Sequence, residues 1–286
     1  MITKSMTGFS EQNFIFKNIK YSIQIKSENS RNLEISISDE LNDYYLNDYL
    51  KKEISKFFSR GKIRIFISTD YLNNNLINFK EVDNIINQYS KILSKKDIVL
   101  NISLTEINNL FERYKAKLSK NKSFRLMMKK NVKKCCVNLA EKQIKEGNRT
   151  INLISKKLLN IKKLKNNFHT RFKKYSRSLE SKYISELKKL DGLEPIIIKK
   201  EVSSYLDKID IEEEITRLDS HIKMLDSIIK KSKKNEIGMT IDFYMQEINR
   251  EANTLSSKSK DPLLSNNAIS IKGLVNQIRE LSANIT

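Results

Sequence analysis

Residues 121–190 read NKSFRLMMKKNVKKCCVNLAEKQIKEGNRTINLISKKLLNIKKLKNNFHTRFKKYSRSLESKYISELKKL, and they contain a single glycine, Gly147, and no proline. Glycine and proline are the residues that most strongly interrupt helices, so this stretch predicts long helical segments. We expect two long helices, arranged as an antiparallel arm, with the turn between them near Asn166-Asn167.

The composition of the whole chain also favours helices. Its 286 residues include six glycines, two prolines and no tryptophan. So little turn-forming material argues against sandwiches, propellers and glycine-rich nucleotide-binding folds. The two cysteines, Cys135 and Cys136, are adjacent, and neighbouring cysteines rarely bridge, which argues against a disulfide scaffold and for a reducing compartment. We expect a cytoplasmic protein without membrane contact, because no membrane-spanning run or signal peptide is recognisable.

The first 70 residues predict a small unit of strands with one helix. Three segments have the apolar–polar alternation or composition of half-buried strands: 21–27, 33–39 and 63–68. The polar residues 27–32 are expected to form a hairpin loop between the first two strands. Apolar positions at helical spacing predict a helix over 41–58, with Gly61 in the position that ends a helix.

The remainder predicts further helices. The segment Asp191-Gly192-Leu193-Glu194-Pro195 is the clearest break in the chain, and Asp261-Pro262 marks another. The expected helices cover 81–94, 196–207, 211–233, 238–257 and 265–283. The resulting fold class is α+β, with a strand-rich N-terminal unit, a long helical arm and a C-terminal helical domain.

The positive charge of the chain is concentrated in its middle. Residues 112–190 hold 25 Lys and Arg against five Asp and Glu, whereas residues 201–286 hold 12 against 14. A basic segment beside a near-neutral, acid-bearing domain is typical of a protein that holds a polyanion near an acid–base or metal site. The alternative is a solvated, lysine-rich coiled coil without a nucleic-acid partner.

Two polar runs near the C-terminal end are candidates for chemistry. In residues 210–221, Glu214, Arg217 and His221 fall on one face of a helix, and Glu213 can reach Arg217 one turn away. His221 is the histidine best placed to titrate near neutral pH, because it lies among acids.

The second run covers residues 242–254. Here Glu247, Arg250, Glu251 and Thr254 share a helix face. Two carboxylates one turn apart can bind a divalent ion or divide acid and base roles, and an arginine between them can hold a phosphate. The alternative for both runs is ordinary salt bridging on a helix surface.

Aromatic residues are interleaved with the basic residues of the middle segment: Tyr114, Phe124, Phe168, Phe172 and Tyr175. Such side chains can stack on unpaired bases. Their helical spacing favours packing of the arm instead.

Several motifs together resemble those of one family. The string QEINREANTLSSKS (246–259) closely resembles QEMNREANTIGSKS, the signature of the bacterial YicC family. Shorter matches are SMTGFS (5–10), SRGK (59–62), Gly147 with its preceding Glu, and EEITRLDSH (213–221). The chain departs from the family pattern at four positions: Glu28 for Val, Ser256 for Gly, and Asn276 and Thr286 for Glu. Two carboxylates of the family pattern are therefore missing near the C-terminal end.

The resemblance implies an N-terminal domain over 1–155, a linking helix over 156–195 and a C-terminal helical domain over 196–286. It also implies a cytosolic, metal-dependent endoribonuclease that acts on single-stranded or structured RNA and assembles as a homo-hexamer. On this basis we expect Glu247 and Glu251, with Glu213 or Glu214, to hold Mn²⁺ or Mg²⁺. The other expected catalytic residues are Glu214, the phosphate clamps Arg217 and Arg250, and His221 as acid, base or orienting group. The expected RNA-binding residues are Arg31, Arg60, Lys62, Lys129, Lys130, Lys133, Lys134 and Lys258.

Two other functions fit the same residues. In one, His221 deprotonates the RNA 2′-hydroxyl and no metal takes part, so that a cyclic phosphate results. In the other, the chain is a non-catalytic RNA-binding scaffold.

Overall fold

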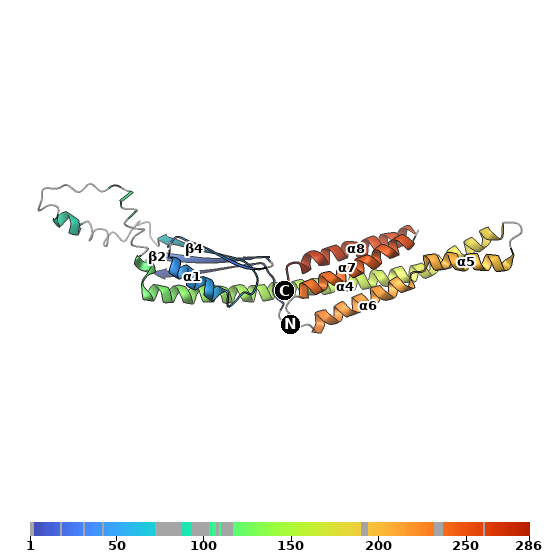
Figure 1. Cartoon of the computed structure of the whole chain (residues 1–286), viewed down its shortest axis with the longest axis horizontal. Coiled ribbons are helices and arrows are strands. Elements are labelled where there is room, and N and C mark those ends of the chain that lie inside the picture. Colours follow the sequence, from blue (N-terminus) through green and yellow to red (C-terminus); the bar gives the residue numbers. More distant parts are fainter. Residues whose placement is uncertain are drawn as a thin grey trace. The chain divides into compact units, whose positions relative to one another are not determined.

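The computed structural model describes residues 3–17, 19–30, 32–41, 43–71, 87–92, 103, 105–106, 109, 117–189, 194–231, 237–259 and 261–286 (Figure 1). Its packing divides the chain into two units. We call Met6–Gln143 the sheet unit, and Met1–Ser5 together with Ile144–Thr286 the helical unit. The order of strands and helices confirms the α+β class.

Helix α4, Lys122–Leu187, is one continuous helix of 66 residues and contributes to both units (Figure 1). The predicted turn near Asn166-Asn167 is therefore wrong. Both asparagines are exposed, where a helix tolerates them at a cost below about 1 kcal/mol each. The helix begins after Asn121, whose side-chain oxygen accepts hydrogen bonds from Ser123 N at 2.9 Å and Phe124 N at 3.2 Å.

The sheet unit contains a four-stranded sheet with the order β1-β2-β4-β3. The strands are β1 Gly8–Phe16, β2 Ile19–Glu28, β3 Leu33–Asp39 and β4 Gly61–Tyr71. The three predicted strands lie within β2, β3 and β4, whereas β1 was not predicted. The predicted hairpin over 27–32 is wrong, because β4 lies between β2 and β3. Strand β4 pairs antiparallel with β2 and parallel with β3.

Helix α1, Tyr44–Ile54, provides the crossover that a parallel β3–β4 pair requires. The predicted helix over 41–58 thus exists but is shorter at both ends. Asp43 caps α1 by accepting a hydrogen bond from Leu46 N at 3.1 Å, and Arg125 Nη2 donates to the same carboxylate at 2.9 Å. Gly61 does not end this helix; it begins β4 with φ of 106°, a conformation that favours glycine.

The core of the sheet unit lies against one face of the sheet. Alternate residues of β2 and β4 are buried, in a cluster with residues of α1 and of the first turns of α4. Cys135 and Cys136 belong to this cluster, and both are free thiols. Burial raises the pKa of the Cys136 thiol to about 12, so this group is an inert packing residue at neutral pH.

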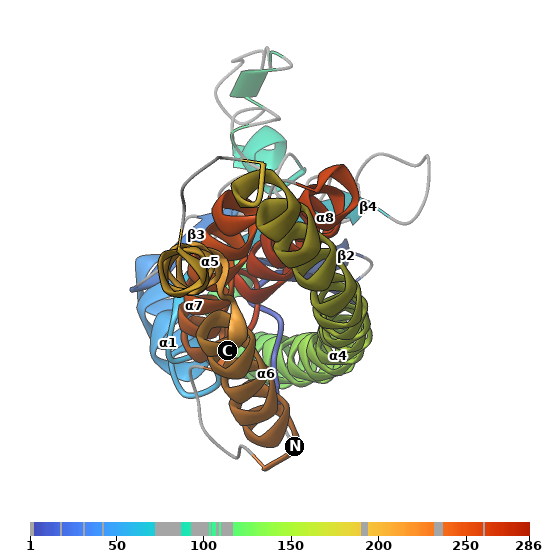
Figure 2. The ribbon, with the colours of Figure 1, turned by 90° about the vertical axis from the view of Figure 1, so that its right-hand side faces the viewer.

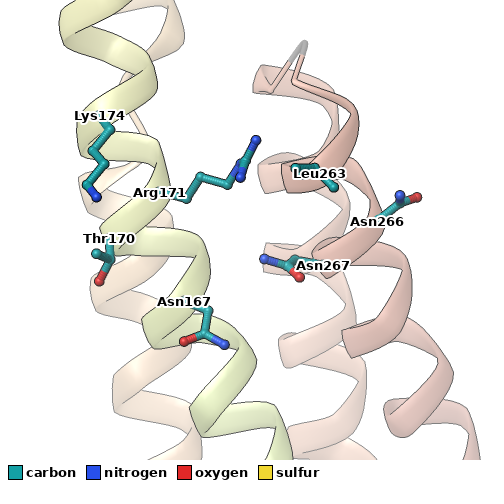
Figure 3. Close-up of a pocket in the computed structure, with 7 residues that line it drawn as sticks. All are labelled: Asn167, Thr170, Arg171, Lys174, Leu263, Asn266 and Asn267. Atoms are coloured by element: carbon teal, nitrogen blue, oxygen red, sulfur yellow. The ribbon is translucent and has the colours of Figure 1, made fainter.

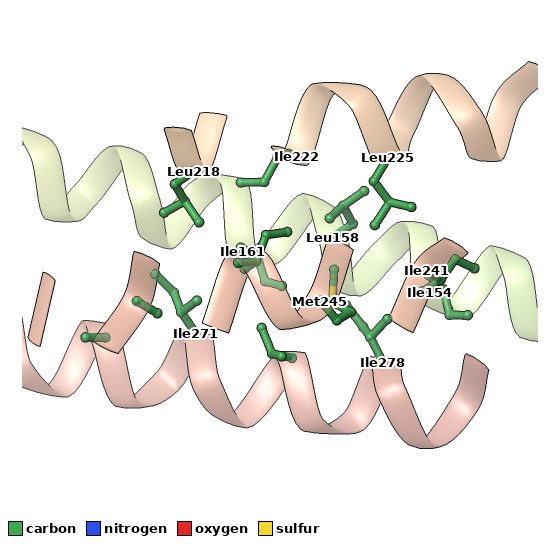
Figure 4. Close-up of a cluster of buried hydrophobic side chains, with 14 of the residues drawn as sticks. Ile154, Leu158, Ile161, Leu218, Ile222, Leu225, Ile241, Met245, Ile271 and Ile278 are labelled. Carbon is green, nitrogen blue, oxygen red and sulfur yellow. The ribbon is translucent and has the colours of Figure 1, made fainter. Parts of the chain in front are cut away.

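The helical unit is a bundle. Its helices after α4 are α5 Pro195–Ile209, α6 Glu212–Lys231, α7 Ile237–Lys258 and α8 Pro262–Ser282, which confirms the four predicted C-terminal helices. Figures 1 and 2 show α4 running alongside α6, α7 and α8, and all four helices share one hydrophobic core (Figure 4). Buried residues of α6, together with Ile211 just before it, repeat at spacings of four and three: Ile211, Ile215, Leu218, Ile222, Leu225 and Ile229. This is the apolar stripe of a helix in a bundle.

The two ends of the described chain are joined within the helical unit. Lys4 N donates to Thr286 O at 3.0 Å, and Thr286 N donates to Lys4 O at 2.9 Å. Two glycines leave room for this terminal pairing. A Cβ on Gly147 would lie 2.3 Å from Thr3 O, and one on Gly238 would lie 2.4 Å from Ile285 O. Side chains at these positions would displace the paired segments.

The predicted helix over 81–94 is only partly described. Residues 87–92 include a helical turn, while the rest of that range lies outside the described residues. None of the described helices combines the length and apolar character needed to cross a bilayer.

Candidate active site

The predicted polar residues meet where α6 and α7 pack together. Besides their apolar packing, two ion pairs and one ring pair join the described residues of the two helices: Lys258 Nζ to Glu214 Oε1 at 2.8 Å, Arg217 Nη1 to Glu251 Oε1 at 4.0 Å, and the rings of His221 and Tyr244 with centroids 6.2 Å apart. Residue numbers rise along α6 as they fall along α7, so the helices are antiparallel. We call these six residues, with Glu213, the α6–α7 seam.

Helix geometry places the α6 side of the seam. Glu214, Arg217 and His221 flank the stripe of buried residues that faces the bundle core, as their three- and four-residue spacing predicts. Glu213 and Glu214 also lie in the first turn of α6. Negative charge is favourable there because it faces the exposed N–H groups and the positive end of the helix dipole.

Glu214 is a buried carboxylate whose two oxygens differ. Its residue is 8% exposed, and Oε1 accepts the hydrogen bond from Lys258. Oε2 is buried and has no hydrogen-bond partner among the described residues. Lys258 also donates to Asp210 O at 2.7 Å, which fixes the ammonium beside the carboxylate. A buried acceptor without a partner is costly, typically about 1–3 kcal/mol, so it marks a place where a further donor or cation would bind favourably.

Glu251 is the second buried carboxylate of the seam, with 4% of its surface exposed. Its contact with Arg217 is an ion pair at 4.0 Å, longer than a hydrogen bond. Arg217 Nη2 also donates to Glu213 Oε1 at 2.5 Å, and 56% of the Arg217 side chain stays exposed. The guanidinium therefore lies between two carboxylates and keeps donors available to solvent or to an anion.

Two predicted residues lie near the seam without joining its contacts. Glu247 is half-buried on the same face of α7, one turn before Glu251. Arg250 is exposed, and its side chain makes no hydrogen bond or ion pair with the described residues. Asp242, from the same polar run, accepts hydrogen bonds from Arg279 Nε and Gln246 Nε2, both at 2.7 Å, and the bond from Arg279 holds its pKa below the usual value.

The carboxylates expected to hold a metal differ in how well they are placed to coordinate a divalent ion. Within the described parts of the chain, no three His, Cys, Asp or Glu residues gather into a metal-binding group. Magnesium, however, is often held by one or two carboxylates together with substrate phosphates. Glu247 and Glu251, one turn apart on α7, fit that mode. Glu213 fits it less well, because its carboxylate is engaged with Arg217.

The predicted RNA-binding residues of the sheet unit differ in their surroundings. Lys130, Lys133 and Lys134 are exposed on α4. Lys129 is half-buried, with its ammonium 3.7 Å from the centre of the Tyr49 ring. These four lysines form a basic stripe on α4, which is placed to meet an anionic partner.

The other predicted RNA-binding residues that the structure describes are half-buried or paired with protein oxygens. Arg60 is half-buried, and its Nε has no hydrogen-bond partner among the described residues. Lys62 Nζ lies 4.0 Å from Glu34. Arg31 lies outside the described residues. Lys258 belongs to the α6–α7 seam, so its ammonium is already bound to protein oxygens.

The aromatic residues of the middle segment pack inside the protein, which confirms the favoured prediction. Phe124 belongs to the core of the sheet unit, while Phe168 and Phe172 belong to the core of the helical unit, against which Tyr175 also packs. The alternative prediction, that these four rings stack on unpaired bases, is therefore wrong. Tyr114 lies outside the described residues.

A cleft that the sequence did not predict lies between α4 and α8 of the helical unit (Figure 3). It encloses about 490 Å³, and we call it the α4–α8 cleft. Its lining residues are Asn167, Thr170, Arg171, Lys174, Leu263, Asn266 and Asn267. The signal in the sequence was the three- and four-residue spacing of polar residues on each helix. Spacing alone, however, does not show which two helices lie side by side.

Comparison with known proteins places the chain in a family. The family model described as "Endoribonuclease YicC-like, N-terminal region" matches residues 3–152, and "Endoribonuclease YicC-like, C-terminal" matches residues 161–286. A curated protein of Clostridioides difficile (strain 630), named "Probable endoribonuclease YicC", is 31% identical over 98% of this chain and 99% of its own length. A protein of the same name from Haemophilus influenzae is 38% identical over 33% of this chain and 32% of its own length. The chain therefore belongs to the YicC-like endoribonuclease family.

Proposed function

We propose that this protein is an endoribonuclease and that the α6–α7 seam is its catalytic centre. Family membership over nearly the whole chain supports RNA cleavage. The observation that carries the choice of site is the pair of buried carboxylates, Glu214 and Glu251, each beside a cation from the neighbouring helix. A site that juxtaposes acids and cations can bind a phosphodiester and also exchange protons with it.

The cations of the seam would receive the phosphate. Arg217 keeps most of its side chain exposed, so its free donors can hold two phosphate oxygens in parallel. Arg250, exposed on α7, is the second proposed clamp. Both would offset the negative charge that builds on the phosphate during cleavage. Lys258 would act indirectly, because it holds Glu214 in place.

A divalent ion, Mn²⁺ or Mg²⁺, is part of the proposal. Glu247 and Glu251 would hold it, and when bound it would lower the pKa of a water molecule and offset charge on the phosphate. Glu214 Oε2, the buried acceptor without a partner, would orient a water molecule or a protonated group beside the site. His221, half-buried against Tyr244, would donate or accept a proton at the edge of the seam.

The basic stripe on α4 would hold RNA by its phosphates. Its lysines are part of the positive charge of residues 112–190, and three of the four are exposed on the helix. Such contacts are independent of sequence, and they suit single-stranded or structured RNA as the substrate.

We further propose a closed homo-oligomer of six subunits in the cytoplasm. Large apolar side chains are exposed in the helical unit, among them Ile196 at 77% and Met239 at 63%. Surfaces of this kind are commonly covered by another subunit. The free, buried cysteines suit a reducing compartment. Light scattering at micromolar concentration tests the assembly, and a monomer would contradict it.

The experiment that tests the function uses end-labelled RNA and the purified full-length protein, with added Mn²⁺ or Mg²⁺ and with a chelator. The expected result is internal cleavage that depends on the ion and leaves a 5′-phosphate on one product. A 2′,3′-cyclic phosphate that forms equally in chelator would support the His221 route instead. RNA binding without cleavage under every condition would support the non-catalytic scaffold.

A further inference from the structure

The α4–α8 cleft has hydrogen-bonding capacity that the protein itself does not use. Asn167 on α4 and Asn266 and Asn267 on α8 line it. In Figure 3 the amides of Asn167 and Asn267 lie in the space between the two helices, whereas the amide of Asn266 lies at the outer edge of α8. None of these amides makes a hydrogen bond within the described part of the chain. Each amide offers donors and acceptors, so the cleft presents unused polar groups that a ligand can engage.

The cleft also carries positive charge. Arg171 reaches from α4 toward α8, and its Nη2 lies 3.2 Å from Asp261 Oδ2 (Figure 3). This contact fixes the guanidinium, while 42% of the side chain remains exposed. Lys174 lies one turn further along α4 and makes no ion pair with a described residue. Two cations against one carboxylate leave the cleft attractive to an anion.

The carboxylate of Asp261 is engaged in structural contacts, so it offsets the positive charge of the cleft only in part. Its Oδ1 accepts hydrogen bonds from Leu263 N at 2.7 Å and Leu264 N at 3.2 Å, which caps α8. Burial acts to raise the pKa of Asp261, but the bonds from Arg171 and the two backbone N–H groups outweigh it and hold the pKa below its usual value. Asp261 stays ionised and keeps Arg171 positioned at the cleft.

These features fit one chemical class of ligand. A phosphate matches Arg171 and Lys174, whereas a side-chain amide matches the donor and acceptor groups on the edge of a nucleobase. Leu263 adds an apolar surface for the flat face of a base. The volume of about 490 Å³ lies in the range of sites for single small molecules rather than for a duplex.

We propose that the α4–α8 cleft binds one unpaired nucleotide unit of an RNA strand. The phosphate lies against Arg171 and Lys174, and the base edge lies against the asparagines. This assignment deepens the proposed function, on which it rests for the strand as the source of the nucleotide. A free mononucleotide has the same chemistry, so the two sources require separate measurements.

The test compares matched variants of the full-length protein. Lys174→Gln removes a cation from the cleft, and Lys173→Gln removes the same charge from the exposed neighbour outside it. Asn266→Ala with Asn267→Ala removes two amides, with Asn276→Ala on α8 as the control outside the cleft. Each protein is titrated, in chelator, with a short unpaired RNA, with a ribose–phosphate oligomer of equal length that lacks bases, and with a nucleoside monophosphate.

The double asparagine variant is expected to weaken binding of the RNA about tenfold and to leave binding of the base-free oligomer unchanged. Lys174→Gln is expected to weaken both, more than Lys173→Gln does. Equal effects of Lys174→Gln and Lys173→Gln, or unchanged RNA binding in the asparagine variant, would overturn the proposal. Tight binding of the monophosphate without preference for the strand would overturn the RNA source.

Cleavage is measured separately on the same proteins, so the two ideas fail independently. If the cleft variants cleave RNA and bind it as the unaltered protein does, the cleft proposal is wrong and the endoribonuclease proposal stands. If RNA binding depends on the cleft but no protein cleaves RNA, the cleft proposal stands and the endoribonuclease proposal is wrong. Thermal unfolding of each variant verifies that the bundle is intact, and the capping residue Asp261 is left unchanged for that reason.

Discussion

The Lys165 ammonium donates a hydrogen bond to Asp219 Oδ1 at 2.5 Å from a position within the apolar stripe of α4. Lys165 lies between the buried residues Ile161 and Phe168 in the four- and three-residue repeat, and only 10% of its side chain is exposed. A nearly buried ammonium is stable in its charged form only with a close acceptor. This pair therefore connects α4 to α6 at a site where an apolar residue would be expected.

Removal of that acceptor should be costly. Asp219→Ala is expected to lower the free energy of unfolding by about 3 kcal/mol, because it leaves the Lys165 ammonium buried without a partner. Chemical denaturation provides the measurement. The control is Asp226→Ala, which removes the exposed pair with Lys230 and should cost less than about 1 kcal/mol. Equal losses in the two variants would contradict the special role of Lys165.

The Lys165–Asp219 pair should make the free energy of unfolding depend on pH in the acidic range. Hydrogen bonds from Lys165 and then Lys223 hold the pKa of Asp219 below its usual value of 3.8. The folded pKa is lower than the unfolded one, so the stabilisation is present above pH 3.8 and is lost as the pH falls through the lowered value. Melting temperatures measured across the acidic range should therefore fall less steeply for Asp219→Asn than for the natural protein. Parallel curves would mean that other carboxylates govern acid unfolding.

Charge removal at the seam should separate cleavage from binding. Glu251→Gln and Glu247→Gln keep the shape of each side chain and remove one negative charge. We expect each to slow RNA cleavage by about 100-fold or more, because a group of this kind contributes several kcal/mol to the site. RNA affinity should be unchanged or higher. Glu280→Gln, at an exposed position of α8, is the control and should keep full activity.

The basic stripe on α4 should control how salt affects binding. Replacement of Lys129, Lys130, Lys133 and Lys134 by Gln should flatten the dependence of log affinity on log salt, by about 0.7 for each lost contact with a single strand. Filter binding over a series of salt concentrations measures this slope. A control that replaces the exposed lysines of α5, Lys199, Lys200 and Lys208, should change it less. The same slope in both proteins would assign the stripe to solubility or assembly.

The terminal pairing should be sensitive to a single methyl group. Gly147→Ala and Gly238→Ala each place a Cβ within 2.4 Å of a backbone oxygen, so we expect a large loss of stability or failure to fold. Gly273→Ala is the matched control, because a Cβ there meets nothing within 4 Å. That change in α8 should stabilise the protein by up to about 1 kcal/mol. Similar melting temperatures for all three would show that the paired ends can move aside.

Local patterns in the sequence were sufficient for most elements but not for their pairing. Strand β1 was missed because the residue types in GFSEQNFIF do not follow its alternating burial. Small or polar residues such as Ser10 face inward, whereas Phe9 and Ile15 are exposed. The hairpin between β2 and β3 was wrong because a parallel partner, β4, enters from further along the chain. The turn in α4 was wrong for another reason. Lys165 interrupts the apolar stripe just before Asn166-Asn167. The sequence does not show that this lysine is buried, because its partner Asp219 lies on another helix.

The candidate site followed the same division. The common face of Glu214, Arg217 and His221 was predictable, because it depends only on helix periodicity. The partners of these residues on α7 depend on how two helices align along their length, which one-turn spacing does not determine. Lys258 was accordingly assigned to RNA, although it binds Glu214 and Asp210. The same limit concealed the α4–α8 cleft.

The pairing of Lys4 with Thr286 has a consequence for the order of events during synthesis. The two residues are 282 positions apart, and a ribosome adds about 5–20 residues per second. The segment around Lys4 therefore waits on the order of tens of seconds before its partner exists. During that time the sheet unit can fold, since it draws only on Met6–Gln143. The helical unit gains these two backbone hydrogen bonds only after Thr286 has emerged from the ribosome, so until then the segment around Lys4 lacks its permanent neighbour.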